Sequence, residues 1–228
     1  MIVNELKTPT ALIFDMDGVL VDSEPLHKRA KELAFEEHGI FLSEAVYDSY
    51  KGRPDATMLP EILTARGWSA ERIEELSRRK REIYESIEHE LKVVPGAAEF
   101  VRWAATRYKI ALATSATARN REASLKLSGV GDLFETVVDA SGHTRPKPNP
   151  EVFLRAIEKL GVSPRDCWII EDSVNGLRAA KAAGCVVVAI TTTFERRILE
   201  KAGADRVVES FEELRALLEG KAGRDLRG

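Results

Sequence analysis

A chain of 228 residues with 44% hydrophobic and 31% charged side chains has the composition of a globular protein, long enough for one large domain or two small ones. It has no apolar run of about 18 residues, so we expect no membrane-spanning helix and no membrane partner. The formal net charge of −3 lacks the basic excess typical of nucleic-acid-binding proteins.

The cysteine content and the N-terminal residues indicate a reducing compartment. Cys167 and Cys185 are too few for a disulfide framework, and each lies in a short apolar run, so we expect two buried thiols. The first ten residues lack the basic-then-apolar pattern of a secretory signal. We therefore expect a cytoplasmic protein. Since no interface pattern is apparent, we expect a monomer.

Short apolar runs rich in branched side chains predict β-strands, and helical patterns lie between them. The predicted strands are 11–15, 109–114, 136–139, 167–171, 186–191 and 206–208. The predicted helices in the same part of the chain are 97–107, 118–127, 150–160, 174–183 and 211–218. This alternation predicts an α/β fold, a Rossmann-like parallel sheet with helices on both faces.

Residues 23–91 interrupt the alternation, because they contain helical patterns and no convincing strand. The predicted helices are 25–38, 43–50, 56–66 and 70–90. We expect a helical cap domain at 22–92, inserted into a catalytic core formed by 1–21 and 93–228. The two connections, near Val21 and Val93, would lie side by side and act as a hinge.

A run of basic residues lies in the last of these helices and comprises Arg78, Arg79, Lys80 and Arg81. We interpret it as a solvated helix face, with a local basic patch as the alternative.

Carboxylates follow two of the predicted strands at the point where each strand ends. Asp15 and Asp17 follow the first strand, and Glu171 and Asp172 follow another. Carboxyl ends of parallel strands meet at one edge of the sheet, where ligands bind in open α/β folds. Such close carboxylates repel one another unless a cation or a shared proton compensates, and Mg²⁺ is the cation that suits them. The alternative is a set of turn and helix-capping residues.

Hydroxyl and ammonium groups accompany these acids. Thr114 and Ser115 end a strand, where their hydroxyls could donate to a phosphate or cap the next helix. Pro146 and Pro148 flank Lys147 and stiffen its loop. A fixed ammonium suits contact with a phosphate or a nucleophilic carboxylate.

Four segments together resemble the haloacid dehalogenase superfamily, in its branch with a helical cap. They are DMDGVLVDSEPLH at 15–27, LATS at 112–115, RPKPNPEVF at 145–153 and IIEDSVNGLRAAKAAG at 169–184. The segments occur in the family's order, and the resemblance covers nearly the whole chain.

The resemblance implies a role for each residue. Asp15 would be the nucleophile that forms an aspartyl-phosphate, and Asp17 would be the general acid and base. The residues implied to contact the phosphoryl group are Thr114, Ser115 and Lys147. Those implied to bind Mg²⁺ are Asp15, Asp17 through its backbone carbonyl, and Asp172, with Glu171 as a helper. An acid at position 17 implies phosphate-ester chemistry, because the dehalogenases lack it.

The cap residues leave two enzymatic alternatives open. His27 and Lys80 match β-phosphoglucomutase, a member of the same branch, and Gly52 lies in a matching loop. Asp55, however, stands where the mutase has an arginine for the distal phosphate, and Arg53 is shifted from that position. We therefore favour a Mg²⁺-dependent phosphatase of small phosphorylated metabolites such as sugar phosphates. A phosphomutase is the alternative, and an inactive binding relative is the third hypothesis.

Overall fold

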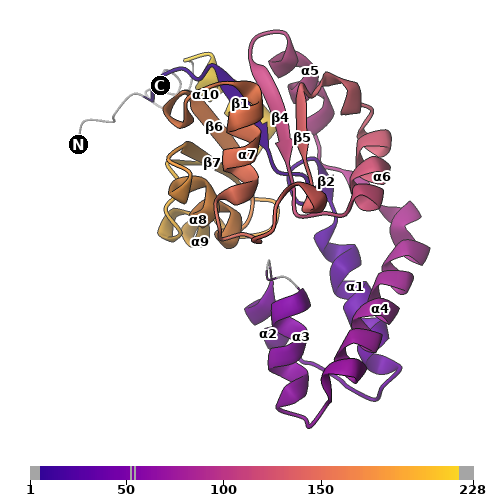
Figure 1. Cartoon of the computed structure of the whole chain (residues 1–228). Coiled ribbons are helices and arrows are strands. Elements are labelled where there is room, and N and C mark those ends of the chain that lie inside the picture. The colour runs from indigo at the N-terminus through magenta and orange to yellow at the C-terminus, as the bar shows by residue number, and fades with distance from the viewer. Residues whose placement is uncertain (1–5, 52, 54, 221–228) are drawn as a thin grey trace, which may run out of the picture. The chain divides into compact units, whose positions relative to one another are not determined.

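The computed structural model describes residues 6–51, 53 and 55–220. The chain divides into two compact units (Figure 1). The larger unit contains the described residues up to Asp22 and from Lys92 onward, and the smaller unit is Ser23–Leu91.

A six-stranded parallel sheet forms the centre of the larger unit, in the order β5-β4-β1-β6-β7-β8. The strands are β1 (Ala11–Phe14), β4 (Lys109–Ala113), β5 (Thr136–Val138), β6 (Cys167–Glu171), β7 (Val186–Ile190) and β8 (Arg206–Val208). The six strand predictions and the parallel α/β architecture are confirmed. Since β4, β1 and β6 are neighbours, the residues that follow them lie at the same edge of the sheet.

Helices and short 3₁₀ turns connect these strands. The helices are α5 (Ala97–Ala105), α6 (Ala118–Ser128), α7 (Glu151–Leu160), α8 (Val174–Ala182), α9 (Arg196–Lys201) and α10 (Phe211–Leu218). The turns are η2 (Gly131–Leu133), η3 (Ala140–Gly142) and η4 (Pro164–Asp166). Helix α9 was not predicted, because it is short, mostly charged and buries only Leu199.

Both faces of the sheet are covered, and β1 shows this residue by residue. Ile13 belongs to an apolar cluster with Phe153 of α7 and Leu177 of α8. Phe14 points to the opposite face, where its ring lies 6.0 Å from the rings of Phe100 and Phe134. Burial on both sides explains why the strand sequence is continuously apolar. Cys167 and Cys185 are free thiols buried in this core, as predicted.

The smaller unit is helical throughout its described elements. They are α1 (Glu24–Glu36), α2 (Glu44–Tyr50), α3 (Asp55–Thr64), α4 (Ala70–Ile87) and the turn η1 (Glu88–Glu90). Helix α4 packs against α1 and α3 through an apolar face that includes Ile73, Leu76 and Ile83. The four predicted helices are therefore present. Among the described residues, no helix has the length and apolar surface needed to cross a bilayer.

The two connections between the units pair with each other. Strand β2 (Val21–Asp22) is antiparallel to β3 (Lys92–Val93), and Val21 lies opposite Val93. The predicted adjacency of the connections is thus confirmed, although two-residue strands are too short to recognise from a sequence pattern.

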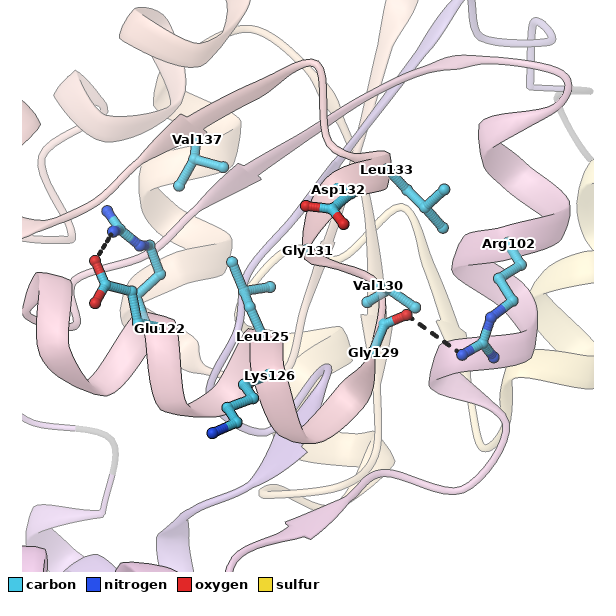
Figure 2. Close-up of a pocket in the computed structure, with 11 residues that line it drawn as sticks. Arg102, Glu122, Leu125, Lys126, Gly129, Val130, Gly131, Asp132, Leu133 and Val137 are labelled. Atoms are coloured by element: carbon cyan, nitrogen blue, oxygen red, sulfur yellow. Dashed lines mark hydrogen bonds and ion pairs between the residues drawn. The ribbon is translucent and has the colours of Figure 1, made fainter.

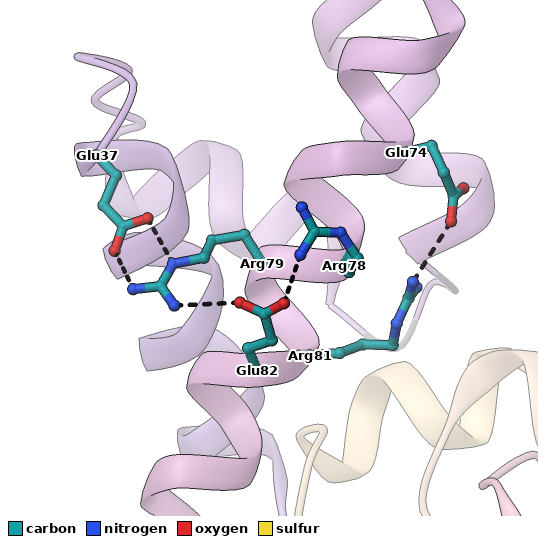
Figure 3. Close-up of polar contacts among 6 residues, drawn as sticks. All are labelled: Glu37, Glu74, Arg78, Arg79, Arg81 and Glu82. Atoms are coloured by element: carbon teal, nitrogen blue, oxygen red, sulfur yellow. Dashed lines mark hydrogen bonds and ion pairs between the residues drawn. The ribbon is translucent and has the colours of Figure 1, made fainter.

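The basic run on α4 is not uniformly solvated, which corrects the interpretation of a solvated face. Arg78 and Arg81 are exposed and Arg79 is half-buried, whereas Lys80 is buried. Each arginine forms an ion pair with a glutamate (Figure 3). The pairs are Arg78–Glu82, Arg79–Glu37, Arg79–Glu82 and Arg81–Glu74. These pairings compensate the positive charge that a basic patch would need.

A pocket of about 750 Å³ lies beside α5, α6, η2 and β5 (Figure 2). Arg102 donates to the carbonyl oxygen of Gly129 at 3.4 Å, and Lys126 and Asp132 also line the pocket. None of the predicted site residues lines it, so it is separate from the site described next.

Candidate active site

Asp15 is the first residue after β1 and is fixed by its backbone. Its N–H donates to the carbonyl oxygen of Ile170 at 3.0 Å, which extends the ladder with β6 by one residue. The side chain is buried, and one carboxylate oxygen lies 2.8 Å from the ammonium nitrogen of Lys147. The strand end therefore presents a carboxylate at the edge of the sheet.

Lys147 bridges two of the predicted acids. Its ammonium nitrogen lies 2.8 Å from Asp15 and 2.7 Å from Glu171, and it also lies 4.8 Å from the ring centroid of Phe153. Burial alone lowers the pKa of Lys147, but these two carboxylates raise it above its ordinary value. The ammonium therefore stays charged.

Both carboxylate oxygens of Glu171 accept hydrogen bonds from groups of the protein itself. One carboxylate oxygen accepts from Lys147, and the other accepts from the N–H groups of Asp172 and Ser173, both at 2.8 Å, and from the Ser173 hydroxyl. A Cβ on Gly176 would overlap this carboxylate. Sequence reasoning missed Gly176, whose only signal is a glycine in the first turn of a helix.

Asp172 is buried beside these groups and takes no part in capping α8. The side-chain cap is Ser173, which accepts from the N–H of Gly176 at 3.0 Å. Burial, followed by the charges of Glu171 and Asp15, raises the pKa of Asp172 well above its usual range. Of the two residues that could have capped this helix, Asp172 and Ser173, the cap is therefore Ser173.

Asp15, Glu171 and Asp172 together form a group that could hold a metal ion. One oxygen from each lies within 4.8 Å of the others. Burial raises the pKa of Asp15 to about 7. The charge of Lys147 opposes this increase, and the charges of Glu171 and Asp17 add to it. Three buried carboxylates thus face a single ammonium, and a hard divalent cation fits this excess of negative charge.

Asp17 is half-buried, two residues beyond Asp15. Its carboxylate is outside the group formed by Asp15, Glu171 and Asp172, and contact of its backbone carbonyl with a metal stays a prediction. The turn continues with a hydrogen bond from Gly18 N–H to the Val21 carbonyl at 2.7 Å.

Thr114 and Ser115 differ in their surroundings. Thr114 follows β4 and is fully buried, and its hydroxyl oxygen accepts from the N–H of Ala116 at 3.0 Å. Its hydroxyl hydrogen can donate to a ligand. Ser115 is exposed. Neither residue caps α6, because the cap is Thr117, which accepts from Asn120.

Two of the predicted cap residues, His27 and Lys80, contact each other in the smaller unit. The Lys80 ammonium lies 2.7 Å from Asp55 and 3.2 Å from Nδ1 of His27, and Lys31 lies 3.8 Å from Asp55. The His27 ring stacks on Tyr84 at 4.3 Å. Since an ammonium can only donate, Nδ1 accepts and the proton of His27 is on Nε2. Burial and the charge of Lys80 lower the pKa of His27 to about 3.

Arg53 is engaged within the same unit. Its guanidinium pairs with Glu61 at 2.6 Å and lies over the ring of Tyr50 at 4.8 Å. Gly52, the other predicted residue of this loop, lies outside the described residues.

Comparison with known proteins agrees with this arrangement. A family model described as haloacid dehalogenase-like hydrolase matches residues 9–184. The chain belongs to the haloacid dehalogenase-like hydrolases. As a member of this family it is an enzyme of the hydrolase class.

Individual relatives in the family cover most of this chain. The YhcW protein of Bacillus subtilis is 37% identical over 181 residues, which are 78% of this chain and 82% of that protein. The phosphorylated carbohydrates phosphatase of Thermotoga maritima is 32% identical, covering 92% of this chain and 98% of that protein. By contrast, the chain spans only 19% of a further relative, SUPPRESSOR OF QUENCHING 1 of Arabidopsis thaliana, at 32% identity.

A solved structure of β-phosphoglucomutase from Clostridium difficile matches with a TM-score of 0.77 and 27% identity, covering 93% of this chain and 98% of that one. This haloacid dehalogenase-like chain is therefore similar to the β-phosphoglucomutase-like members of the family.

The raised pKa of Asp15 predicts how the stability of the metal-free protein depends on pH. Between its ordinary value of 3.8 and about 7, folded Asp15 retains a proton that the unfolded chain has released. The contribution of this group to the free energy of unfolding is therefore lost as the pH rises through this range. A cation binds the deprotonated carboxylates, so we expect Mg²⁺ to raise the Tm more at about pH 8 than at about pH 5.5.

Scanning calorimetry with EDTA or Mg²⁺ measures both effects, and an Asp15→Asn variant is the control because it should show a smaller pH dependence. An equal Mg²⁺ effect at the two pH values would contradict the role of a proton on Asp15.

Proposed function

We propose that this protein is a Mg²⁺-dependent phosphatase of small phosphorylated metabolites, with sugar phosphates as the expected class, acting through an aspartyl-phosphate on Asp15. The observation that carries the proposal is the buried contact of Asp15 with Lys147, beside Glu171 and Asp172, at the carboxyl ends of adjacent strands. The name of the Thermotoga maritima relative supports the substrate class. A cytoplasmic location and a monomeric state stay predictions.

The proposed reaction has two displacements at phosphorus. A carboxylate oxygen of Asp15 forms a bond to phosphorus while the bond to the ester oxygen breaks, and Asp17 gives that oxygen a proton. Asp17 then takes a proton from water, the water oxygen bonds to phosphorus, and the bond to Asp15 breaks. Inorganic phosphate leaves, and Asp15 is restored.

The remaining residues compensate charge during these steps. Lys147, already charged and fixed, would attract the phosphoryl oxygens and the Asp15 carboxylate, and the Thr114 hydroxyl would donate to a phosphoryl oxygen. Asp15, Asp172 and the backbone carbonyl of Asp17 would hold Mg²⁺, with Glu171 as a helper. Bound Mg²⁺ would supply positive charge that lets an anionic carboxylate approach an anionic phosphate.

The phosphomutase is the second candidate, because the paired His27 and Lys80 match that enzyme and a mutase is among the structural neighbours. The charges around its expected distal-phosphate position disfavour it. Asp55 carries a negative charge there, and Arg53 is held by Glu61. A mutase needs a cation for a second phosphate, so we favour water over a sugar hydroxyl as the acceptor.

Product analysis separates the two functions. We expect β-glucose 1-phosphate, with Mg²⁺ and a trace of glucose 1,6-bisphosphate, to give inorganic phosphate and little glucose 6-phosphate. The matched control is the Asp15→Asn protein, which should release neither product. Rapid formation of glucose 6-phosphate with little free phosphate would overturn the phosphatase in favour of the mutase. If no phosphate monoester in a broad panel were hydrolysed, the inactive binding relative would replace both.

A further inference from the structure

A third loop, following β7, is joined to the two loops that carry the acids. The hydroxyl of Thr192 donates to the carbonyl oxygen of Gly18, in the turn after β1. The hydroxyl of the next residue, Thr193, hydrogen-bonds to the carboxylate of Asp172, in the loop after β6. Two adjacent threonines therefore tie the ends of β1 and β6 to the end of β7.

Gly18 shows how closely these groups pack. Its φ of +74° lies in the left-handed region, and a Cβ there would overlap the Asp172 carboxylate and crowd the Thr193 hydroxyl. Asp172 is thus confined between the Gly18 backbone on one side and Thr193 on another. A side chain confined in this way has little freedom to change its rotamer.

Thr193 supplies a hydrogen-bond donor to Asp172, whereas the ammonium in the site pairs with the other two acids. Lys147 forms its ion pairs with Asp15 and Glu171. Asp172 is buried, and one of its carboxylate oxygens lies within 4.8 Å of oxygens of both other acids. The one hydrogen that Thr193 donates fixes the carboxylate and leaves further lone pairs of Asp172 available to a cation.

We propose that Thr193 is a positioning residue that holds the Asp172 carboxylate in the orientation needed to bind a divalent cation. Groups that hydrogen-bond to metal ligands typically change metal affinity by about 10–100-fold when removed. The inference rests on the proposed function, because it takes the acidic group as the cation site.

Binding of Mn²⁺ in the absence of substrate, followed by electron paramagnetic resonance, tests the inference without relying on activity. Thr193→Val keeps the shape of the side chain but removes the hydroxyl, and we expect it to weaken Mn²⁺ binding by about 10-fold or more. Thr193→Ser keeps the hydroxyl and should bind within about threefold of the wild type. At saturating Mg²⁺, kcat of Thr193→Val should return close to the wild-type value.

The matched control is Thr191→Val, at the end of the same strand. The backbone N–H of Thr191 donates to the Val208 carbonyl at 3.1 Å, and its hydroxyl has no partner among the described residues. We expect wild-type Mn²⁺ affinity from this variant, which separates loss of the Thr193 hydroxyl from a general effect of valine in this loop.

Each other outcome is decisive. Unchanged Mn²⁺ affinity in Thr193→Val, with saturable binding by the wild type, would overturn the inference and leave the proposed function standing. Equal weakening in Thr193→Ser and Thr193→Val would also overturn it, because the hydroxyl would then not matter. If Thr193→Val did not fold, the Thr193→Ser comparison and a Thr193→Ala variant would decide in the same way. Failure of the wild type to bind Mn²⁺ saturably would overturn both the inference and the Mg²⁺ dependence of the proposed function.

Discussion

Replacing Asp15 with Asn should abolish phosphate-ester hydrolysis while making the metal-free protein more stable. The variant keeps the size of the side chain but removes the attacking oxygen anion, so we expect kcat/KM to fall by about a thousandfold or more. The same change removes a carboxylate that burial, Glu171 and Asp17 disfavour in its charged form. We therefore expect the free energy of unfolding near neutral pH to rise by about 1–2 kcal/mol, as found where active sites exchange stability for function.

Steady-state hydrolysis and urea denaturation in EDTA measure the two effects on one protein preparation. Asp22→Asn is the control, because Asp22 is an exposed aspartate outside the acidic group and should leave both quantities unchanged. Appreciable turnover by Asp15→Asn would rule out Asp15 as the nucleophile. A loss of stability would show that its pairing with Lys147 outweighs the repulsion among the acids.

Replacing Lys147 with Gln should damage both the fold and the reaction. Asp15 and Glu171 would lose their shared ammonium and remain buried beside Asp172. Breaking a buried ion pair by removing one partner typically costs about 3–5 kcal/mol. Loss of a fixed charge at the phosphoryl group should also lower kcat by about 100–1,000-fold.

Urea denaturation at several pH values measures the effect on stability. The difference in the free energy of unfolding between the variant and the wild type should shrink toward acid pH. There the carboxylates of Asp15 and Glu171, left without an ammonium, can bind protons. Lys109→Gln is the matched control: the Lys109 ammonium donates to the neutral carbonyl oxygen of Leu160, so no buried charge is left unpaired. Equal losses in the two variants, or a loss independent of pH, would argue against an ionised acidic group held by Lys147.

The fold was predictable because its signals are local. The strand that ends at Phe14 is continuously apolar, and the acids after it mark the edge of the sheet at which ligands bind. The short β2–β3 pair and α9 have too few residues for a pattern. The position of Lys80 escaped prediction for another reason, since its partner Asp55 is 25 residues away in sequence. Only tertiary packing shows that this lysine is buried.

In the candidate site too, some residues have a local sequence signal and others depend on tertiary packing. The acids and Lys147 were predictable as residue types at strand ends and in a proline-flanked loop. The supporting contacts were not, because nothing in the sequence around Gly176 or Thr193 specifies which carboxylate lies against it. Such contacts depend on how three loops from separate strands come together.

The ammonium of Lys147, held between Asp15 and Glu171, has a consequence for how the protein matures. It acts as a covalently attached counter-ion, present from the moment the chain leaves the ribosome. Small zinc domains, by contrast, fold only when their metal arrives. Here we expect the sheet edge to assemble first and the proposed divalent ion to bind afterwards. Under the proposed function, we therefore expect protein prepared in EDTA to be folded and added Mg²⁺ to restore hydrolysis without a refolding step.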